Sequence, residues 1–171
     1  MDRPEWIAVH PKTREEYCAL TNNANRGKEG APARDAANPR GENVFGHIVR
    51  WRERDGDAGA ARFRWNVFVL GGDPTLADAG KHGDIKGDVF GSPDGLWFDH
   101  RGVLWIQTDV STSVLGKGDY ARLGQWELKG SVSFDDAELL PVLATHARQP
   151  GGAELGEAES VRGGVYRFAP I

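Results

Sequence analysis

The chain has 171 residues, of which 39% are hydrophobic and 27% charged, and its formal net charge is −4. Its 23 glycines and 9 prolines exclude a long-helix bundle or a coiled coil and favour short elements joined by turns. The single cysteine excludes an intrachain disulfide, and the mild acidity weighs against nucleic-acid binding, because contact with phosphate backbones needs a basic face.

Short runs of β-branched and aromatic residues, each bounded by turn residues, predict strands rather than helices. The first two strands are expected to form one hairpin, and the last two a second hairpin closed by a Gly102 turn. Between them lies a strand pair separated by an Asp55-Gly56 turn. In chain order the predicted strands are 6–9, 17–21, 46–51, 62–70, 96–98 and 103–108.

Two segments lack a strand pattern. The stretch from Asn22 to Asn43 contains no apolar residue larger than Ala, which predicts a long polar loop. Residues 124–171 are interpreted as a divergent tail beyond a first domain of residues 1–123. The Ser133-Phe134-Asp135-Asp136 sequence is typical of a helix start, so we expect one short helix there. The composition of 151–164, rich in Gly, Glu, Ala and Ser, predicts partial disorder.

The two outer hairpins resemble each other in sequence. Pro4-Glu5-Trp6-Ile7 matches Pro93-Asp94-Gly95-Leu96, and the two prolines stand 89 residues apart. That spacing is about two periods of the roughly 40 to 50 residues in a propeller blade. We therefore predict an all-β fold, a partial β-propeller with two to three blades of antiparallel strands. A β-sandwich would give similar strand spacing and stays open as an alternative.

Oxygen-bearing side chains mark the ends of both hairpins. In an antiparallel hairpin, the residue that begins the first strand lies beside the one that ends the second. Glu5 should therefore approach Asn22 or Asn23, and Asp94 should approach Asp109. Neighbouring carboxylates repel unless a proton or a cation separates them, and hard cations such as calcium take oxygen ligands. The alternative is that Asp94 belongs to a Ser-Pro-Asp-Gly turn and that the two asparagines begin a loop.

Other candidate residues have a structural interpretation beside a functional one. Arg3 could present its planar guanidinium to a phosphate, or be an ordinary surface arginine. His47 and Cys18 are expected in the core rather than at a metal or a reactive site. Alternation along the strands also favours core packing over a ligand-stacking role for four tryptophans: Trp51, Trp65, Trp97 and Trp105.

Residues 3–123 resemble one known family, the PhoX-type alkaline phosphatases, which are large secreted bacterial phosphomonoesterases. The similarity lies in an ordered set of segments: 3–9 (Arg-Pro-Glu-Trp-Ile-Ala-Val), 17–23, 38–41 (Asn-Pro-Arg-Gly), 46–48 (Gly-His-Ile), 92–99 (Ser-Pro-Asp-Gly-Leu-Trp-Phe-Asp) and 104–109. This resemblance implies a six-bladed β-propeller that hydrolyses phosphate monoesters with iron (Fe³⁺) and calcium (Ca²⁺) at the mouth of its channel.

The resemblance also implies roles for individual residues. Glu5 looks like a metal-ligand glutamate and Arg3 like the neighbouring arginine that contacts phosphate. For Asn22, Asn23, Asp94 and Asp109 it implies calcium ligation or support of that site. Clustered metals and an arginine suit phosphate-ester hydrolysis, because both neutralise charge on the phosphoryl oxygens.

The chain departs from the family in length and localisation signals. Family chains are several times longer and are exported to the periplasm or secreted, whereas no apolar core of a signal peptide or membrane span occurs here. A truncated gene or a disrupted reading frame is our hypothesis for the short chain.

Two further functions stay open. One is a non-catalytic propeller fragment that binds calcium, or pairs with another chain that completes the propeller through open sheet edges. The other is a calcium-dependent, lactonase-like propeller. No membrane partner is expected.

Overall fold

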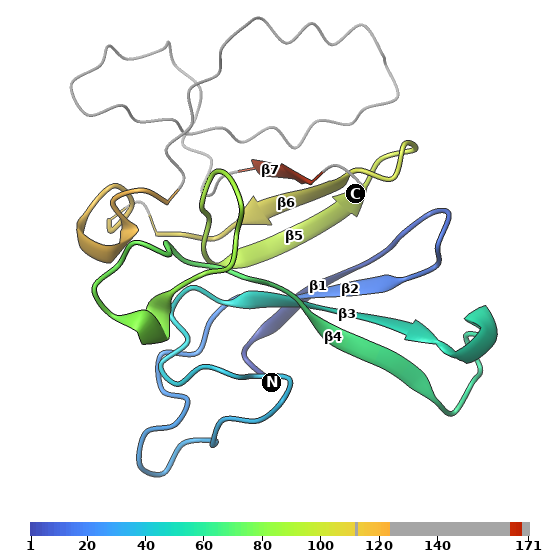
Figure 1. Cartoon of the computed structure of the whole chain (residues 1–171), viewed down its shortest axis with the longest axis horizontal. Coiled ribbons are helices and arrows are strands. Elements are labelled where there is room, and N and C mark those ends of the chain that lie inside the picture. The colour runs from blue at the N-terminus through green and yellow to red at the C-terminus, as the bar shows by residue number, and fades with distance from the viewer. Residues whose placement is uncertain (112, 124–164, 169–171) are drawn as a thin grey trace, which may run out of the picture.

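The computed structural model describes residues 1–111, 113–123 and 165–168, and within them the fold is all-β (Figure 1). In this described part of the chain, seven strands form two antiparallel sheets, accompanied by three single-turn 3₁₀ helices, Arg54–Gly56, Ala79–Lys81 and Gly118–Tyr120. The first sheet has the order β1-β2-β3-β4, and the second has the order β5-β6-β7. The strands are β1 (Pro4–Val9), β2 (Glu16–Leu20), β3 (His47–Glu53), β4 (Phe63–Leu70), β5 (Pro93–Phe98), β6 (Leu104–Thr108) and β7 (Val165–Phe168). The predicted all-β, partial-propeller fold is confirmed as two open sheets, each in a blade-like arrangement.

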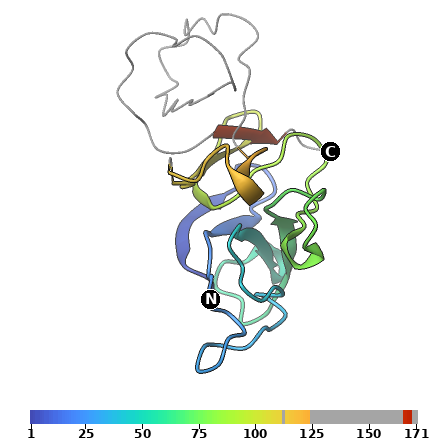
Figure 2. The ribbon, with the colours of Figure 1, turned by 90° about the vertical axis from the view of Figure 1, so that its left-hand side faces the viewer.

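The two sheets pack face to face through one apolar core. Figures 1 and 2 both show β5 and β6 above the first sheet, and β5 contacts β1 and β2. Burial of this surface is the main stabilising contribution to the pairing of the sheets. The buried apolar residues between them are Tyr17, Ala19, Ile48, Val69, Ile85, Phe90, Leu96, Leu104 and Ile106.

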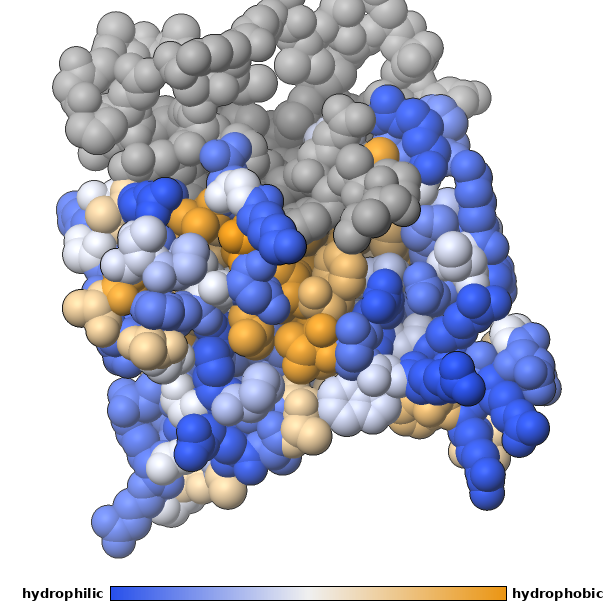
Figure 3. Space-filling view, in the orientation of Figure 1, coloured by the Kyte–Doolittle hydropathy of each residue, from blue (hydrophilic) through white to orange (hydrophobic). Residues whose placement is uncertain are grey.

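The opposite face of the first sheet is only partly covered. It buries Cys18, Leu20 and Val49 as a small cluster with Trp51 packed against it. Toward the sheet margins, large apolar side chains are open to solvent. Ile7, Val9, Phe63 and Trp65 are 58%, 45%, 58% and 44% exposed. Figure 3, which shows one face of the molecule, places apolar side chains at its centre and hydrophilic ones around them.

The expectation of core packing for all four tryptophans is therefore wrong for two of them. Trp65 and Trp97 are 44% and 50% exposed, although each is paired across strands with another tryptophan. Alternation along a strand predicts which residues share a face, but it does not say whether another layer covers that face. Trp51 and Trp105 are half-buried.

The two hairpins begin with the same backbone geometry. Arg3 and Ser92, each followed by a proline, adopt left-handed φ values of 51° and 53°. Each hairpin then has a register irregularity, between Pro4 and Ile7 in β1 and between Pro93 and Leu96 in β5. The Arg3 carbonyl accepts from the amide of Thr21 at 3.0 Å, and the Ser92 carbonyl accepts from that of Asp109 at 2.9 Å. The similarity seen in the sequence is thus a structural repeat.

The first hairpin, β3 and β5 meet closely at one point. A side chain at Gly46 would place its Cβ 2.1 Å from the Thr21 carbonyl oxygen, so only glycine fits there. The Thr21 hydroxyl donates to the Pro93 carbonyl at 2.8 Å. These contacts fix the start of the second hairpin beside the end of β2.

The long polar loop predicted between Asn22 and Asn43 is present. An isolated bridge between Asn23 and Asn43 closes it at its base. His47, in the core as expected, is fully buried, with its Nδ1 2.9 Å from Asn43 Nδ2 and its Nε2 2.7 Å from the Ala37 carbonyl. Burial lowers the pKa of His47, because the charged imidazolium loses its hydration.

Two other expectations concern Cys18 and the tail. Cys18 is buried, and burial raises the pKa of its thiol, as expected for an unreactive core cysteine. The helix expected from Ser133 onward lies outside the described residues. One segment of the tail is described, β7, which pairs with β6 and had no signal in the sequence analysis. Within the described residues, no helix is long and apolar enough to cross a bilayer.

Candidate functional site

Charged side chains converge where the two hairpins begin. Arg3 and Glu5 belong to the start of the first hairpin, Asp94 is the second residue of β5, and Asp109 directly follows β6. Each hairpin brings its own first and last residues to one end, and β1 contacts β5. The fold therefore gathers one guanidinium and three carboxylates at the shared end of the two sheets.

Arg3 joins the two hairpins. Its Nε donates to Glu5 Oε1 at 2.5 Å, and its Nη2 donates to Asp109 Oδ2 at 2.9 Å. The hydrogen bond to Glu5, and then that to Asp109, raises the pKa of Arg3 above its already high usual value. The side chain is 46% exposed, so the oriented guanidinium still faces solvent.

Asp94 is the third carboxylate of the cluster. Partial burial raises its pKa, and the charges of Glu5 and Asp109 raise it further, while Arg3 acts in the opposite direction. Pro93 pairs directly with Thr108, so the neighbouring residues Asp94 and Asp109 lie at the same end of the second hairpin, as the antiparallel geometry predicts. Three carboxylates around one arginine leave an excess of negative charge, which a cation would neutralise.

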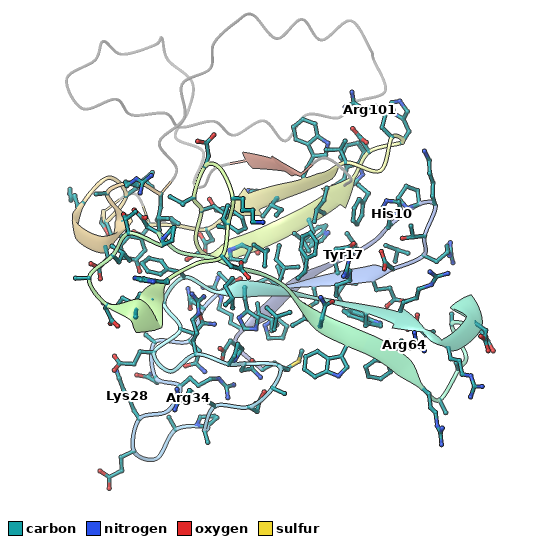
Figure 4. All side chains as sticks on the ribbon, in the orientation of Figure 1. His10, Tyr17, Lys28, Arg34, Arg64 and Arg101 are labelled. Carbon is teal, nitrogen blue, oxygen red and sulfur yellow. The ribbon has the colours of Figure 1, made fainter. Side chains whose placement is uncertain are left out.

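A cavity of about 430 Å³ lies beside this cluster. Arg3, Asn22 and Asp109 contribute polar groups to it. Its other lining residues are Val44, Ser92, Val110, Ser111, Val114 and Tyr120. The turns of both hairpins, with His10 and Arg101, lie at the end opposite the charged cluster. Figure 4 shows them far from the long loop that bears Lys28 and Arg34.

Asn23 has a structural role. Its Oδ1 accepts from the Asn25 amide at 3.0 Å, and its backbone amide donates to the Asn43 carbonyl at 2.7 Å. These bonds shape the first turn of the long loop. Asn22, by contrast, lines the cavity beside Arg3.

The side chains of this site can be compared with the ligands that the implied metals, calcium and iron, would need. Carboxylate and amide oxygens are the ligands that hard cations prefer, and burial first, then the neighbouring carboxylates, raise the pKa of Asp94. Within the described residues, however, no group of three or more His, Cys, Asp or Glu side chains is arranged to hold a metal ion. Glu5 and Asp109 are instead bound to Arg3. The residues are of the type that an oxygen-lined site uses, but the described residues alone do not form one.

Some lining residues were missed by the sequence analysis. Ser92 could have been found, because it stands before Pro93 as Arg3 stands before Pro4 in the matching motif. Val44 and Tyr120 come from connecting segments without periodicity, and no sequence signal brings them to the cavity. Tyr120 is placed there by an edge-to-face contact with Phe45, at 5.0 Å between ring centroids.

Comparisons with known proteins agree with this fold. The family described as alkaline phosphatase PhoX matches residues 1–148. Among solved structures, that of Pseudomonas fluorescens PhoX in complex with vanadate, a transition state analogue, is 47% identical, with a TM-score of 0.66. The alignment covers 72% of this chain and 21% of that one, so this chain spans about a fifth of its length. No curated protein matches significantly.

Two open antiparallel sheets with an arginine–carboxylate cluster at their shared end are the arrangement expected of a partial β-propeller. The chain belongs to the PhoX alkaline phosphatase family. PhoX proteins are metal-dependent phosphatases, and family membership favours this class over a lactonase-like propeller. The match runs past residue 123, where the sequence analysis places a domain boundary; that boundary stays a prediction.

Proposed function

We propose that this chain is a segment of a PhoX-type, metal-dependent phosphatase that hydrolyses phosphate monoesters. The observation that carries the proposal is Arg3, held between Glu5 and Asp109 beside a cavity where the two hairpins begin. The similar P. fluorescens PhoX supports it, because that protein forms a complex with vanadate, a transition state analogue.

In this proposal Arg3 binds a phosphoryl oxygen of the substrate. Its Nε and Nη2 are held by carboxylates, so the planar group is oriented before substrate arrives, and its exposed edge meets the phosphate. The positive charge balances charge that develops on the equatorial oxygens. The cavity lined by Val110 and Tyr120 provides space for the organic part of the ester.

Glu5, Asp94 and Asp109, with Asn22 and Asn23, are the proposed metal ligands or their supports. Calcium and iron, the ions implied by the family, would supply Lewis-acid polarisation of the phosphoryl group and an activated oxygen nucleophile. The chain's own contribution is to hold oxygen donors at one place. Because the chain spans about a fifth of the P. fluorescens PhoX length, further ligands are expected from other parts of a complete protein.

The test is hydrolysis of p-nitrophenyl phosphate by the purified chain with added calcium and iron. We expect Glu5→Gln to abolish turnover, because it removes a charged oxygen donor that also orients Arg3. The matched control is Glu29→Gln, at an exposed glutamate of the long loop. No turnover by the wild type above the Glu5→Gln level would remove the catalytic proposal for this chain. Elemental analysis of the purified protein measures its metal content.

A second candidate function rests on the exposed face of the first sheet. Ile7, Val9, Phe63 and Trp65 together present more apolar surface than isolated surface residues do. A non-catalytic fragment would use this face and the open strand β1 to pair with a chain that completes the propeller. Sedimentation of the chain alone, compared with Trp65→Lys and the exposed control Lys117→Ala, tests this. A monomer at all concentrations in all three proteins would count against self-pairing.

A further inference from the structure

A buried ion pair lies one residue from the candidate site. Asp2 is completely buried and Arg26 is 2% exposed, and Arg26 Nε donates to the Asp2 carboxylate. The other carboxylate oxygen of Asp2 accepts from Asn43 Nδ2 at 2.9 Å, and its backbone amide donates to Asn38 Oδ1 at 2.9 Å. Side chain and backbone of Asp2 are thus both fixed to the long polar loop.

Arg3 is held between this anchor and the sheet. On one side it is joined by the peptide bond to Asp2, and on the other its carbonyl accepts from the Thr21 amide at the end of β2. Between these two points it adopts a φ of 51°. A residue other than glycine keeps such a conformation only when its surroundings determine it.

The matching residue of the second hairpin is held differently. Ser92 has nearly the same φ, 53°, but its amide donates directly to the Phe45 carbonyl at 2.7 Å. Backbone contacts suffice there. In the first hairpin the Arg3 amide donates only to the nearby Met1 carbonyl, at 3.2 Å, and the link to the long polar loop comes from Asp2, through its side chain and its amide.

The chemistry of the Asp2–Arg26 pair also indicates that it fixes the position of the chain rather than adding much stability. Burying two opposite charges contributes little to stability, because the lost hydration offsets their attraction. Arg26 fixes Asp2 while its Nη1 donates to the Ala33 carbonyl and lies 3.4 Å from Asp35 Oδ2, so one planar group connects three parts of the chain. Neither Asp2 nor Arg26 lines the cavity.

We propose that the Asp2–Arg26 pair is a positioning device for Arg3: through Asp2, the long polar loop sets the backbone conformation that turns the Arg3 guanidinium toward Glu5 and Asp109. Asp2 and Arg26 are positioning residues and do not touch the substrate. The functional part of the inference rests on the proposed phosphate-binding role of Arg3, whereas the conformational part does not.

The experiment uses the full chain with Asp2→Asn and Arg26→Gln combined, which removes both buried charges together; Asp35, the other carboxylate near Arg26, is 53% exposed. The control is Lys28→Gln combined with Glu42→Gln, an exposed pair at 3.2 Å in the same loop. One readout is the strong intraresidue amide-to-Hα nuclear Overhauser effect that a positive φ gives Arg3. The other is the affinity for inorganic phosphate, with KM and kcat separated where turnover is measurable.

We expect the double variant to remain folded, to lose the Arg3 signature and to bind phosphate about tenfold more weakly, with KM affected more than kcat. The control should match the wild type in both readouts. An unchanged Arg3 signature in the folded variant would overturn the inference. If the wild type itself binds no phosphate, the proposed function fails, and the Arg3 signature still decides the conformational inference.

If the double variant does not fold, Arg26→Lys takes its place. This variant keeps the positive charge and loses the planar group that connects Asp2 with the loop. Loss of the Arg3 signature in that variant supports the positioning role, and a wild-type signature overturns it.

Discussion

The β1–β2 and β5–β6 hairpins share a backbone and differ in the side chains placed on it. Both start with a left-handed residue before a proline, and both have the same register irregularity. The first contributes Arg3 and Glu5 at the shared end, whereas the second contributes Asp94 and Asp109. Because the two hairpins repeat one backbone geometry, their starts lie at the same end, and Arg3 of the first hairpin reaches Asp109 of the second.

The largest expected effect concerns Arg3, whose counterpart at the start of the second hairpin is Ser92. Arg3→Gly removes the guanidinium while glycine tolerates the positive φ, and we expect kcat/KM for p-nitrophenyl phosphate to fall about 10²- to 10³-fold. Arg14→Gly is the matched control, since Arg14 is also left-handed, at 62°, in the turn at the far end of the same hairpin. Similar losses in both variants would show that backbone conformation, not the Arg3 side chain, matters.

The next effect compares the two hairpin turns. Asp99 is buried and accepts from the Arg101 and Val103 amides, both at 3.0 Å, while His10 Nδ1 accepts from the Lys12 and Thr13 amides at 3.1 and 3.0 Å. Because the Asp99 acceptor is charged, Asp99→Ala should lower the free energy of unfolding by about 3 kcal/mol and His10→Ala by about 1 kcal/mol. Urea denaturation at pH 7 measures both. Equal losses would contradict the distinction.

The Asp99 effect should also depend on pH. Burial acts to raise the pKa of Asp99, but hydrogen bonds from Arg101, Val103 and Trp105 outweigh it and lower the pKa to about 2. The folded state therefore favours the ionised form, and its stabilisation is complete above about pH 4, the ordinary range for aspartate, and lost as pH falls toward 2. The difference between wild type and Asp99→Ala should shrink across that range.

A smaller effect tests whether the second hairpin contributes a metal ligand or only a turn. Asp94→Asn should weaken calcium binding about tenfold, because a charged oxygen donor becomes neutral. Isothermal titration of the wild type, Asp94→Asn and the exposed control Asp88→Asn measures this. Equal affinities in all three proteins would mean that Asp94 is a turn residue.

The smallest effect concerns His47 of the first sheet; the strands of the second sheet, β5, β6 and β7, contain no histidine. Burial first, and then the charges of Arg40 and Arg26, lower the pKa of His47, while the Ala37 carbonyl and Asp2 act to raise it. The unfolded chain thus binds a proton more readily, so stability should fall as pH drops below about 6.5. The melting temperature of His47→Gln should vary less between pH 7 and pH 5; parallel curves would contradict this.

Much of this arrangement was predictable from local patterns. Six strands follow from alternation and turn residues, and the antiparallel rule correctly brings Asp94 near Asp109. The bond from Arg3 to Asp109 was not predictable, because it depends on how two hairpins 89 residues apart in sequence pack together. Arg26 carries no signal either, since a buried arginine in a polar loop looks like any solvated one.

Some failures have a different physical origin. Trp65 and Trp97 were expected in the core because alternation reveals a face but not what covers it. The described residues contain no complete group of metal ligands, and the chain spans about a fifth of the P. fluorescens PhoX length. The proposed ligands therefore stay predictions for the titration and elemental analysis to test.

The pairing of β7 with β6 has a consequence for the order of folding. Neighbouring strands of the first sheet are joined by shorter connections, whereas residues 109–164 intervene between β6 and β7. Bringing two strands together across more residues costs more chain entropy, and this pairing is the most non-local one in the second sheet. Amide hydrogens of β2 and β3 should consequently gain protection from exchange early during refolding, and those that β6 and β7 share should gain it last.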